Sequence, residues 1–273
     1  MSVIEIKNLT RDFGQEKGIF DISLEVNNGE VFGFLGPNGA GKTTTIRHLM
    51  GFLQSKTGTC TINGMDCFKE RDIIQKNLGY IPGEISFFED MTGKEFLSFL
   101  SKYRNLDNYE RQQELIERFE LNIDSKIKKM SKGTKQKIGI VAAFMHDPDI
   151  LILDEPTSGL DPLMQNRFIE LIEEEKKKNK TILLSSHIFD EVERTCDQIG
   201  IIKDGRIVNA CPVETLRKRH MHTYKVTLEN EEEAKRFAKD FDGTLDGNMV
   251  RVASKQSLEE IFLAYYGGGE SDD

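Results

Sequence analysis

The sequence predicts an α/β nucleotide-binding core, in which strand-like segments alternate with helical ones. Two motifs support this prediction. The apolar run Val31 to Leu35 is followed directly by a glycine-rich loop, which leads into a helix expected from about Gly41 to Phe52. A second apolar run, Ile150 to Leu153, ends in two adjacent carboxylates. A strand, a glycine-rich loop and a helix in this order are typical of a phosphate-binding site.

The glycine-rich loop has the spacing G-x4-G-K-[ST]. Its glycines allow backbone conformations that turn successive N–H groups toward an anion, at the positive end of the following helix. We expect Lys42 to reach the β- and γ-phosphates of a nucleoside triphosphate, and the Thr43 hydroxyl to ligate Mg²⁺. The alternative, a chance glycine-rich turn, fits the strand and helix on either side less well. The predicted nucleotide-binding residues of the loop are Gly36, Asn38, Gly39, Ala40, Gly41, Lys42, Thr43 and Thr44.

The two carboxylates after the second apolar run are Asp154 and Glu155. Successive strand residues point to opposite faces, so Asp154 can hold Mg²⁺ while Glu155 faces the γ-phosphate and activates water. His187 follows the next predicted strand, at the carboxyl edge where open α/β sheets bind ligands, and is expected to contact the γ-phosphate. Lys42, Glu155 and His187 are therefore the predicted catalytic residues. The competing interpretations are a solvated acidic turn and a structural histidine.

Composition limits the classes of function. The chain has 273 residues, 30% of them charged, and a net charge of −9. This acidic balance argues against nucleic acid as a partner, because nucleic-acid binding needs a basic face. Its apolar stretches are far shorter than a membrane span, so a cytoplasmic or peripheral location is expected. The four cysteines form no C-x-x-C pair, and buried reduced thiols are expected.

The remaining elements follow from apolar spacing. Besides the helix after the loop, a helix is expected near Met164 to Lys178, where the charge run 173–178 indicates a solvated face. Strands are expected over Val3 to Lys7, Gly18 to Val26, Val31 to Leu35, Thr59 to Ile62, Ile150 to Leu153, Thr181 to Leu184, Ile199 to Ile202 and Ile207 to Asn209.

The chain is predicted to divide into an ATP-binding domain, 1–221, and a small α/β appendage, 222–266. Within the first, a helical subdomain is expected over about 84–145. The final residues, 267–273, are expected to be a disordered acidic tail. The appendage is predicted to contain two strands and two helices, over Tyr224 to Leu228, Glu231 to Phe241, Met249 to Val252 and Leu258 to Tyr266.

Together these motifs resemble the ATP-binding subunit of an ABC transporter, from Met1 to about Met221. The resemblance implies a P-loop NTPase core of the ABC ATPase type, with an antiparallel β subdomain and a helical subdomain. It assigns Phe13 to stacking on adenine and His187 to the role of switch histidine. It also identifies the segment from Ser158 to Asp161 as the D-loop. The segment 130–134 stands where the family signature reads Leu-Ser-Gly-Gly-Gln. Its Ser131 and Gly133 would cap the ATP held by a second protomer, although Ser131 can also be a simple helix cap.

The chain departs from the family pattern in the signature segment and at Gly83. Lys132 and Thr134 replace signature residues, and Gly83 stands where the family has a glutamine. Glycine has no side chain with which to ligate Mg²⁺. Either Glu84 or water fills that coordination position, or nucleotide binding is coupled to the transport partner in another way. The aromatics that follow, near Phe87, are expected in the helical subdomain's core or in a groove for a membrane subunit.

The resemblance implies an ATPase subunit that powers a separate membrane permease, as part of an ATP-driven exporter of a drug, peptide antibiotic or lipid. Two protomers, expected to be identical, would close on two ATP molecules and reopen on hydrolysis. The protein would lie in the cytoplasm, at the inner face of the membrane. The alternative is an ABC ATPase without a transport role, acting on ribosomes or chromosomes. Such proteins usually carry two cores or a long coiled coil, and a metabolic kinase would lack the signature.

Overall fold

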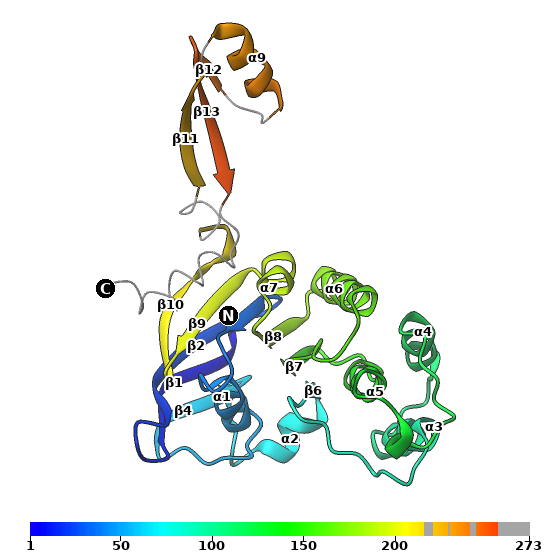
Figure 1. The fold of residues 1–273 in the computed structure, drawn as a ribbon. Coiled ribbons are helices and arrows are strands. Elements are labelled where there is room, and N and C mark those ends of the chain that lie inside the picture. The colour runs from blue at the N-terminus through cyan, green and yellow to red at the C-terminus, as the bar shows by residue number, and fades with distance from the viewer. Residues whose placement is uncertain (216–220, 229, 241–243, 256–273) are drawn as a thin grey trace. The chain divides into compact units, whose positions relative to one another are not determined.

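The computed structural model describes residues 1–215, 221–228, 230–240 and 244–255 (Figure 1). The chain divides into two compact units, Met1–Ala210 and Cys211–Asp273. This division lies before the predicted domain boundary at 221. Each unit is described by itself.

A six-stranded sheet forms the centre of the first unit, in the order β10-β9-β3-β8-β7-β6. β3 lies between β8 and β9 and is parallel to both, while β7 is parallel to β8 and β6. Every residue of β3, β7 and β8 is buried, as expected for strands covered on both faces. The strands are β3 Val31–Leu35, β6 Leu78–Ile81, β7 Ile150–Asp154, β8 Thr181–Ser186, β9 Gln198–Lys203 and β10 Arg206–Pro212.

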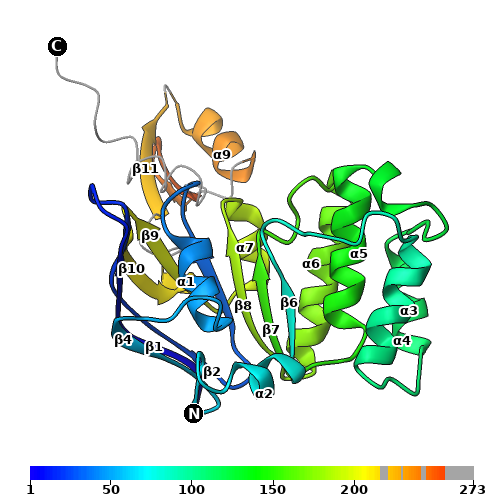
Figure 2. The same ribbon diagram turned by 90° about the horizontal axis from the view of Figure 1, so that it is seen from below.

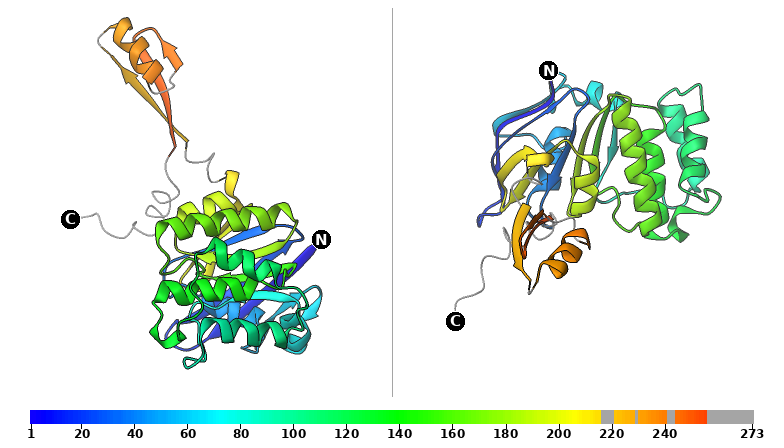
Figure 3. Two further views of the ribbon diagram at one scale, coloured as in Figure 1. Left: turned by 90° about the vertical axis from the view of Figure 1, so that its right-hand side faces the viewer. Right: turned by 90° about the horizontal axis from the view of Figure 1, so that it is seen from above.

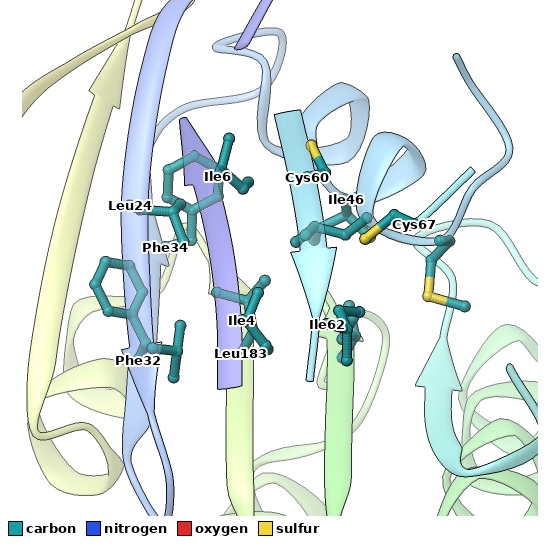
Figure 4. Packing of buried hydrophobic residues seen from close by; sticks show 14 of the residues in the cluster. Ile4, Ile6, Leu24, Phe32, Phe34, Ile46, Cys60, Ile62, Cys67 and Leu183 are labelled. Atoms are coloured by element: carbon teal, nitrogen blue, oxygen red, sulfur yellow. The ribbon is translucent and has the colours of Figure 1, made fainter. Parts of the chain in front are cut away.

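A four-stranded antiparallel sheet, in the order β2-β1-β4-β5, shares its core with the central sheet. The inward residues Ile4 and Ile6 of β1 belong to the same cluster as Phe32 and Phe34 of β3 and Ile46 of α1 (Figure 4). This shared core fixes α1 and the loop before it between the two sheets. None of the four cysteines forms a disulfide, and Cys60 and Cys67 are buried in this cluster. Cys211 is only partly buried, so the expectation of buried thiols holds for three of the four. The elements are β1 Ser2–Asp12, β2 Gly18–Asn27, α1 Lys42–Leu49, β4 Thr57–Ile62 and β5 Met65–Asp66.

The predicted helical subdomain contains three α-helices, which lie with α6 on one side of the parallel sheet (Figures 2 and 3). A capping box between Thr92 and Glu95 starts α3, and Ser131 caps α5. The helices of the first unit are α2 Arg71–Lys76, α3 Gly93–Tyr103, α4 Glu110–Arg118, the 3₁₀ turn Ile127–Lys129, α5 Lys132–Phe144, α6 Pro162–Lys177 and α7 Phe189–Thr195.

Ion pairs join α4 to α6. Arg111 contacts Glu175 at 2.5 Å, and Arg118 contacts Glu174 at 2.6 Å. Arg118 uses both terminal nitrogens on the two Glu174 oxygens, which is the strong bidentate arrangement. The interpretation of 173–178 as a solvated face is therefore wrong for Glu175, which is 1% exposed. It was wrong because the partner, Arg111, belongs to a helix far away in the sequence.

The second unit contains a three-stranded antiparallel sheet in the order β11-β13-β12, together with helix α9. The predicted strand and helix segments from 224 to 252 correspond to observed elements, while β12 was not predicted. The predicted helix Leu258 to Tyr266 and the tail 267–273 lie outside the described residues. The elements are β11 Met221–Thr227, α9 Glu231–Asp240, β12 Thr244–Asp246 and β13 Met249–Lys255.

His146, just after α5, faces the start of β6. One of its ring nitrogens lies 3.2 Å from the Leu78 carbonyl oxygen, and Arg104 donates to the same carbonyl. Burial, with a smaller contribution from the positive charge of Arg104, lowers the pKa of His146 to about 4. The folded protein therefore holds this ring neutral where the unfolded chain would take up a proton.

We expect the protein to lose stability as the pH falls from about 6.5 to about 4, because only the unfolded state binds a proton at this histidine over that range. The loss from this group should be about 2 kcal/mol by pH 4.5. His146→Gln should show a shallower pH dependence of the free energy of unfolding, measured by urea denaturation at pH 7 and pH 5. Equal slopes for the two proteins would contradict the expectation.

Candidate nucleotide-binding site

The loop between β3 and α1 is held in a conformation that favours glycine. Gly39 and Gly41 have φ of +84° and +111°, in the left-handed region. Gly36 lies so close to β9 that an added Cβ would come within 2.5 Å of the Ile202 carbonyl oxygen. The loop therefore needs glycine at these three positions, and α1 begins at Lys42 with its N-terminus at the end of the loop.

Lys42 is folded back over this loop and is 4% exposed. Its Nζ donates to the carbonyl oxygens of Gly36 at 2.6 Å and Pro37 at 3.1 Å, and lies 3.0 Å from Glu155 Oε1. A single buried ammonium group thus joins the glycine-rich loop to the end of β7. The structure brings together the residues predicted from the two separate motifs.

Asp154 is fully buried at the end of β7. Its Oδ1 accepts a hydrogen bond of 2.5 Å from Ser185 Oγ, whereas its buried Oδ2 has no hydrogen-bond partner in the described part of the chain. A Cβ built on Gly83 would lie 3.0 Å from this Oδ2 and 3.8 Å from Thr43 Oγ1. The carboxylate and hydroxyl therefore face one region in front of Gly83, and these hard oxygen donors suit a small divalent cation.

Glu155 adopts a φ of +51°, which is uncommon for a residue with a side chain. Its backbone N–H donates to the Ser185 carbonyl at 3.1 Å, so the turn is held against the end of β8. Its Oε1 pairs with Lys42, and its Oε2 contacts His187 Nδ1. His187 is itself half-exposed. The three predicted catalytic residues are therefore in direct contact, from three different segments of the chain.

These residues border a cavity of about 930 Å³. Asp154 lies buried behind its wall, while Gly36 and Ala40 belong to the loop but do not line the cavity. Arg47, Phe52 and Tyr80 also line it, and sequence reasoning did not predict them. Arg47 could have been found, because it lies four residues after Thr43 on the same face of α1. The predicted residues that line the cavity are Phe13, Asn38, Gly39, Gly41, Lys42, Thr43, Thr44, Glu155 and His187.

Phe13 lies in the turn between β1 and β2 and is 56% exposed. The Arg11 guanidinium is 5.4 Å from the centroid of its ring, within the range of a cation–π contact. Because Phe13 also lines the cavity, its ring presents an aromatic surface to whatever the cavity holds. This geometry suits stacking on a nucleobase.

Ser131 and Gly133 are not among the residues that line this cavity. Ser131 Oγ accepts a hydrogen bond of 3.1 Å from the Thr134 N–H, so it does cap α5, and Gly133 packs on the Gly159 backbone. Lys132 covers Gly159 and donates to Ser158 Oγ at 3.0 Å. The signature segment thus contacts the loop that follows Glu155, within the same chain.

Gly83 and Glu84 connect the cavity to a row of aromatic side chains. Both residues line the cavity, and Glu84 is exposed. Beyond them, Phe88, Phe99 and Tyr103 form what we call the aromatic strip, with exposures of 56%, 43% and 74%. Ring centroids are 5.8 Å apart between the first two and 6.5 Å apart between the last two. The expectation of a core position holds for Phe87, which packs edge to face on the buried Phe96 at 5.1 Å. The groove for a membrane subunit stays a prediction.

Comparison with known proteins agrees with this geometry. The model of the ABC transporter family matches residues 19–158. The bacitracin transport ATP-binding protein BcrA of Bacillus licheniformis is 36% identical over 236 residues, which are 85% of this chain and 77% of that protein. A solved ATP-binding subunit of an ABC transporter is 32% identical, with a TM-score of 0.72, and the match covers 80% of this chain and 93% of that one. A dimeric ATP-binding cassette solved in a post-hydrolysis state with ADP and Pi is 20% identical, with a TM-score of 0.69, and the match covers 77% and 98%.

We expect Lys42→Ala to reduce ATP turnover by about 100-fold or more and to weaken nucleotide binding, because it removes the positive charge held over the loop. The fold should be retained, since the polar contacts of Lys42 in the described part of the chain are with the loop and Glu155. Steady-state ATPase assays and nucleotide titrations check this, with the melting temperature as a measure of folding. Lys17→Ala, at an exposed lysine on the rim of the same cavity, is the control. Normal turnover by the folded Lys42→Ala protein would exclude the loop from the reaction.

Proposed function

The chain belongs to the ABC transporter family as one of its ATP-binding proteins and is an ATPase, and on this basis we propose that it powers export through a separate membrane permease. The observation that carries the proposal is the direct contact of Lys42, Glu155 and His187 beside the phosphate-binding loop. A hydrolytic site of this kind needs a fixed positive charge for the phosphates and a group that activates water.

In this proposal the loop N–H groups and Lys42 hold the phosphates of ATP, and Phe13 stacks on adenine. Glu155 orients and deprotonates the attacking water, while His187 contacts the γ-phosphate and keeps the Glu155 carboxylate in place. The strained backbone of Glu155 places its side chain toward Lys42 rather than into the sheet.

We assign Mg²⁺ to the oxygens in front of Gly83. The residues fit, because Asp154 Oδ2 is buried without a hydrogen-bond partner in the described part of the chain and Thr43 supplies a hydroxyl near it. When bound, the cation neutralises charge on the phosphates. An added Cβ at position 83 would lie only 3.0 Å from that oxygen, so Gly83 leaves space for water where the family glutamine would stand.

The second nucleotide contact comes from another protomer. Ser131 and Gly133 stand at the N-terminus of α5 and do not line the cavity of their own chain. A helix N-terminus favours anions, so this segment is suited to the phosphates held by a partner. A dimer of ATP-binding subunits, with two copies of this chain as the simplest form, completes each site in this way.

The aromatic strip is the surface that we assign to the permease. In the described part of the chain, no helix is long and apolar enough to cross a membrane. A membrane partner must therefore be held by surface contacts, and exposed aromatics are typical of such interfaces. Phe88 of the strip follows Glu84, which lines the nucleotide cavity, by four residues in the sequence, so a short segment would link a partner seated there to the cavity. On this proposal, the subunit lies at the cytoplasmic face of the membrane.

Of the three classes of compound proposed for export, the similarity to BcrA, which is named for bacitracin transport, supports a peptide antibiotic. The net charge of −9 supports a protein partner rather than nucleic acid.

Glu155→Gln keeps the shape of the side chain but removes the base. We expect this variant to bind ATP, to hydrolyse it at least about 100-fold more slowly, and to accumulate as a dimer in Mg²⁺ and ATP. Size-exclusion chromatography with light scattering measures the dimer, and ADP should return it to the monomer. Glu16→Gln, at an exposed glutamate lining the same cavity, should behave as wild type. A nucleotide-saturated Glu155→Gln protein that stays monomeric would rule out closure by the isolated subunit.

Replacing Phe88 and Phe99 by serine together should release the subunit from membranes, because it removes apolar contact area from the aromatic strip. Basal ATP hydrolysis should stay within about twofold, since neither residue lines the cavity. Sedimentation of native membranes, with immunodetection of the subunit, measures attachment. Val208→Ser, at an exposed apolar residue on β10, is the matched control. If the double variant and the control are recovered equally with membranes, the permease contact lies elsewhere on the surface. If the wild-type subunit is found wholly in the soluble fraction, an ATPase without a transport role is favoured.

A further inference from the structure

A buried hydrogen-bonded group lies beneath the contact between Glu155 and His187. Thr157, Ser186 and Glu191 are each 2–3% exposed. Glu191 Oε2 accepts a hydrogen bond of 2.6 Å from Ser186 Oγ and one of 3.3 Å from Thr157 Oγ1. One carboxylate oxygen thus joins two loops that come from different strands.

These loops are the ones that carry the catalytic pair. Thr157 follows Glu155 by two residues, and Ser186 directly precedes His187. The Ser186 hydroxyl also accepts a hydrogen bond of 2.9 Å from the Ile188 N–H, which closes the backbone around His187. The loops that carry Glu155 and His187 are therefore joined twice, once by the contact between these two side chains and once by the buried hydrogen bonds to Glu191.

The turn after β7 needs such support. Glu155 is held at positive φ, a conformation that persists only where the surroundings fix it. Gln136 of α5 donates to the Pro156 carbonyl at 2.7 Å, and the Glu191 carboxyl holds the next residue, Thr157. These two buried contacts fix the turn from opposite elements, α5 and α7.

A carboxyl group is an unfavourable way to fill this space. Glu191 Oε1 is buried and has no hydrogen-bond partner in the described residues, and burial raises the pKa of this carboxyl to about 7. An apolar side chain would avoid that desolvation, but it would leave the two hydroxyls without an acceptor. Only a residue with an acceptor oxygen, such as Glu191, can bind both hydroxyls at once.

We propose that Glu191 is a positioning residue for ATP hydrolysis, which fixes Glu155 and His187 relative to each other by holding Thr157 and Ser186 on one oxygen. The inference rests on the roles proposed above for the catalytic pair. Glu191 does not line the nucleotide cavity, so it acts on the geometry of the reaction and not on ATP binding.

Two variants of similar shape separate the acceptor from the charge. Glu191→Gln keeps an acceptor oxygen for both hydroxyls, whereas Glu191→Met fills the space without one. We expect Glu191→Met to lower kcat by about tenfold or more while KM for ATP stays within about twofold, and Glu191→Gln to restore kcat to within about twofold of wild type. A wild-type kcat in Glu191→Met, or an equal loss in both variants, would overturn the proposal.

The donors offer a second approach that does not depend on the folding of the Glu191 variants. Thr157→Val combined with Ser186→Ala should reproduce the loss of kcat, and adding Glu191→Met to this pair should lower kcat little further, because all three changes break one link. Additive losses would mean that the residues act independently and would contradict the proposal. Glu155→Gln distinguishes failure of the proposed catalytic role from failure of the positioning role. Full ATPase activity in Glu155→Gln would refute the catalytic role of Glu155. An inactive Glu155→Gln together with a normal Glu191→Met would refute the positioning role of Glu191 alone.

Discussion

The parallel pairing of β8 with β3 on one side and β7 on the other is the constraint on which the rest of the site depends. It sets Leu35, Asp154 and Ser185 or Ser186 at one edge of the sheet, in register. The phosphate loop, the carboxylates and His187 each follow one of these strand ends. The backbone hydrogen bonds between these strands bring the three segments close together, so their side chains can contact one another. The buried faces of the three strands keep that ladder from slipping.

Much of this arrangement could be predicted from the sequence, because its strongest signals are local. The strand Val31–Leu35 was predicted with the observed bounds, since an apolar run next to glycines has few other interpretations. The edge strand β6 was not predicted, because it has only four residues and includes Gly79. The burial of Glu175 was also missed, as its charged partner lies on α4. Patterns along the chain report how one segment meets the interior, but they do not report which distant segment it meets.

The departures from the family pattern have different structural settings. Gly83 sits against Asp154 Oδ2 and leaves open the space that a side chain would fill. Lys132, by contrast, adds a contact, since it covers Gly159 and bonds Ser158. Neither setting could be read from the residue alone. In both places the contacting residues lie at or just after the end of β7, more than twenty residues away in the sequence.

The ion pairs between α4 and α6 bear on how the molecule transmits force. Asp161 caps the N-terminus of α6, directly after the loop that Lys132 contacts, while Glu174 and Glu175 lie near its C-terminus. The C-terminal end of α6 is therefore bound to the helical subdomain, and its N-terminal end follows the loop after Glu155. A displacement of the helical subdomain can therefore reach the loop after Glu155 through α6, a route that does not pass through α1.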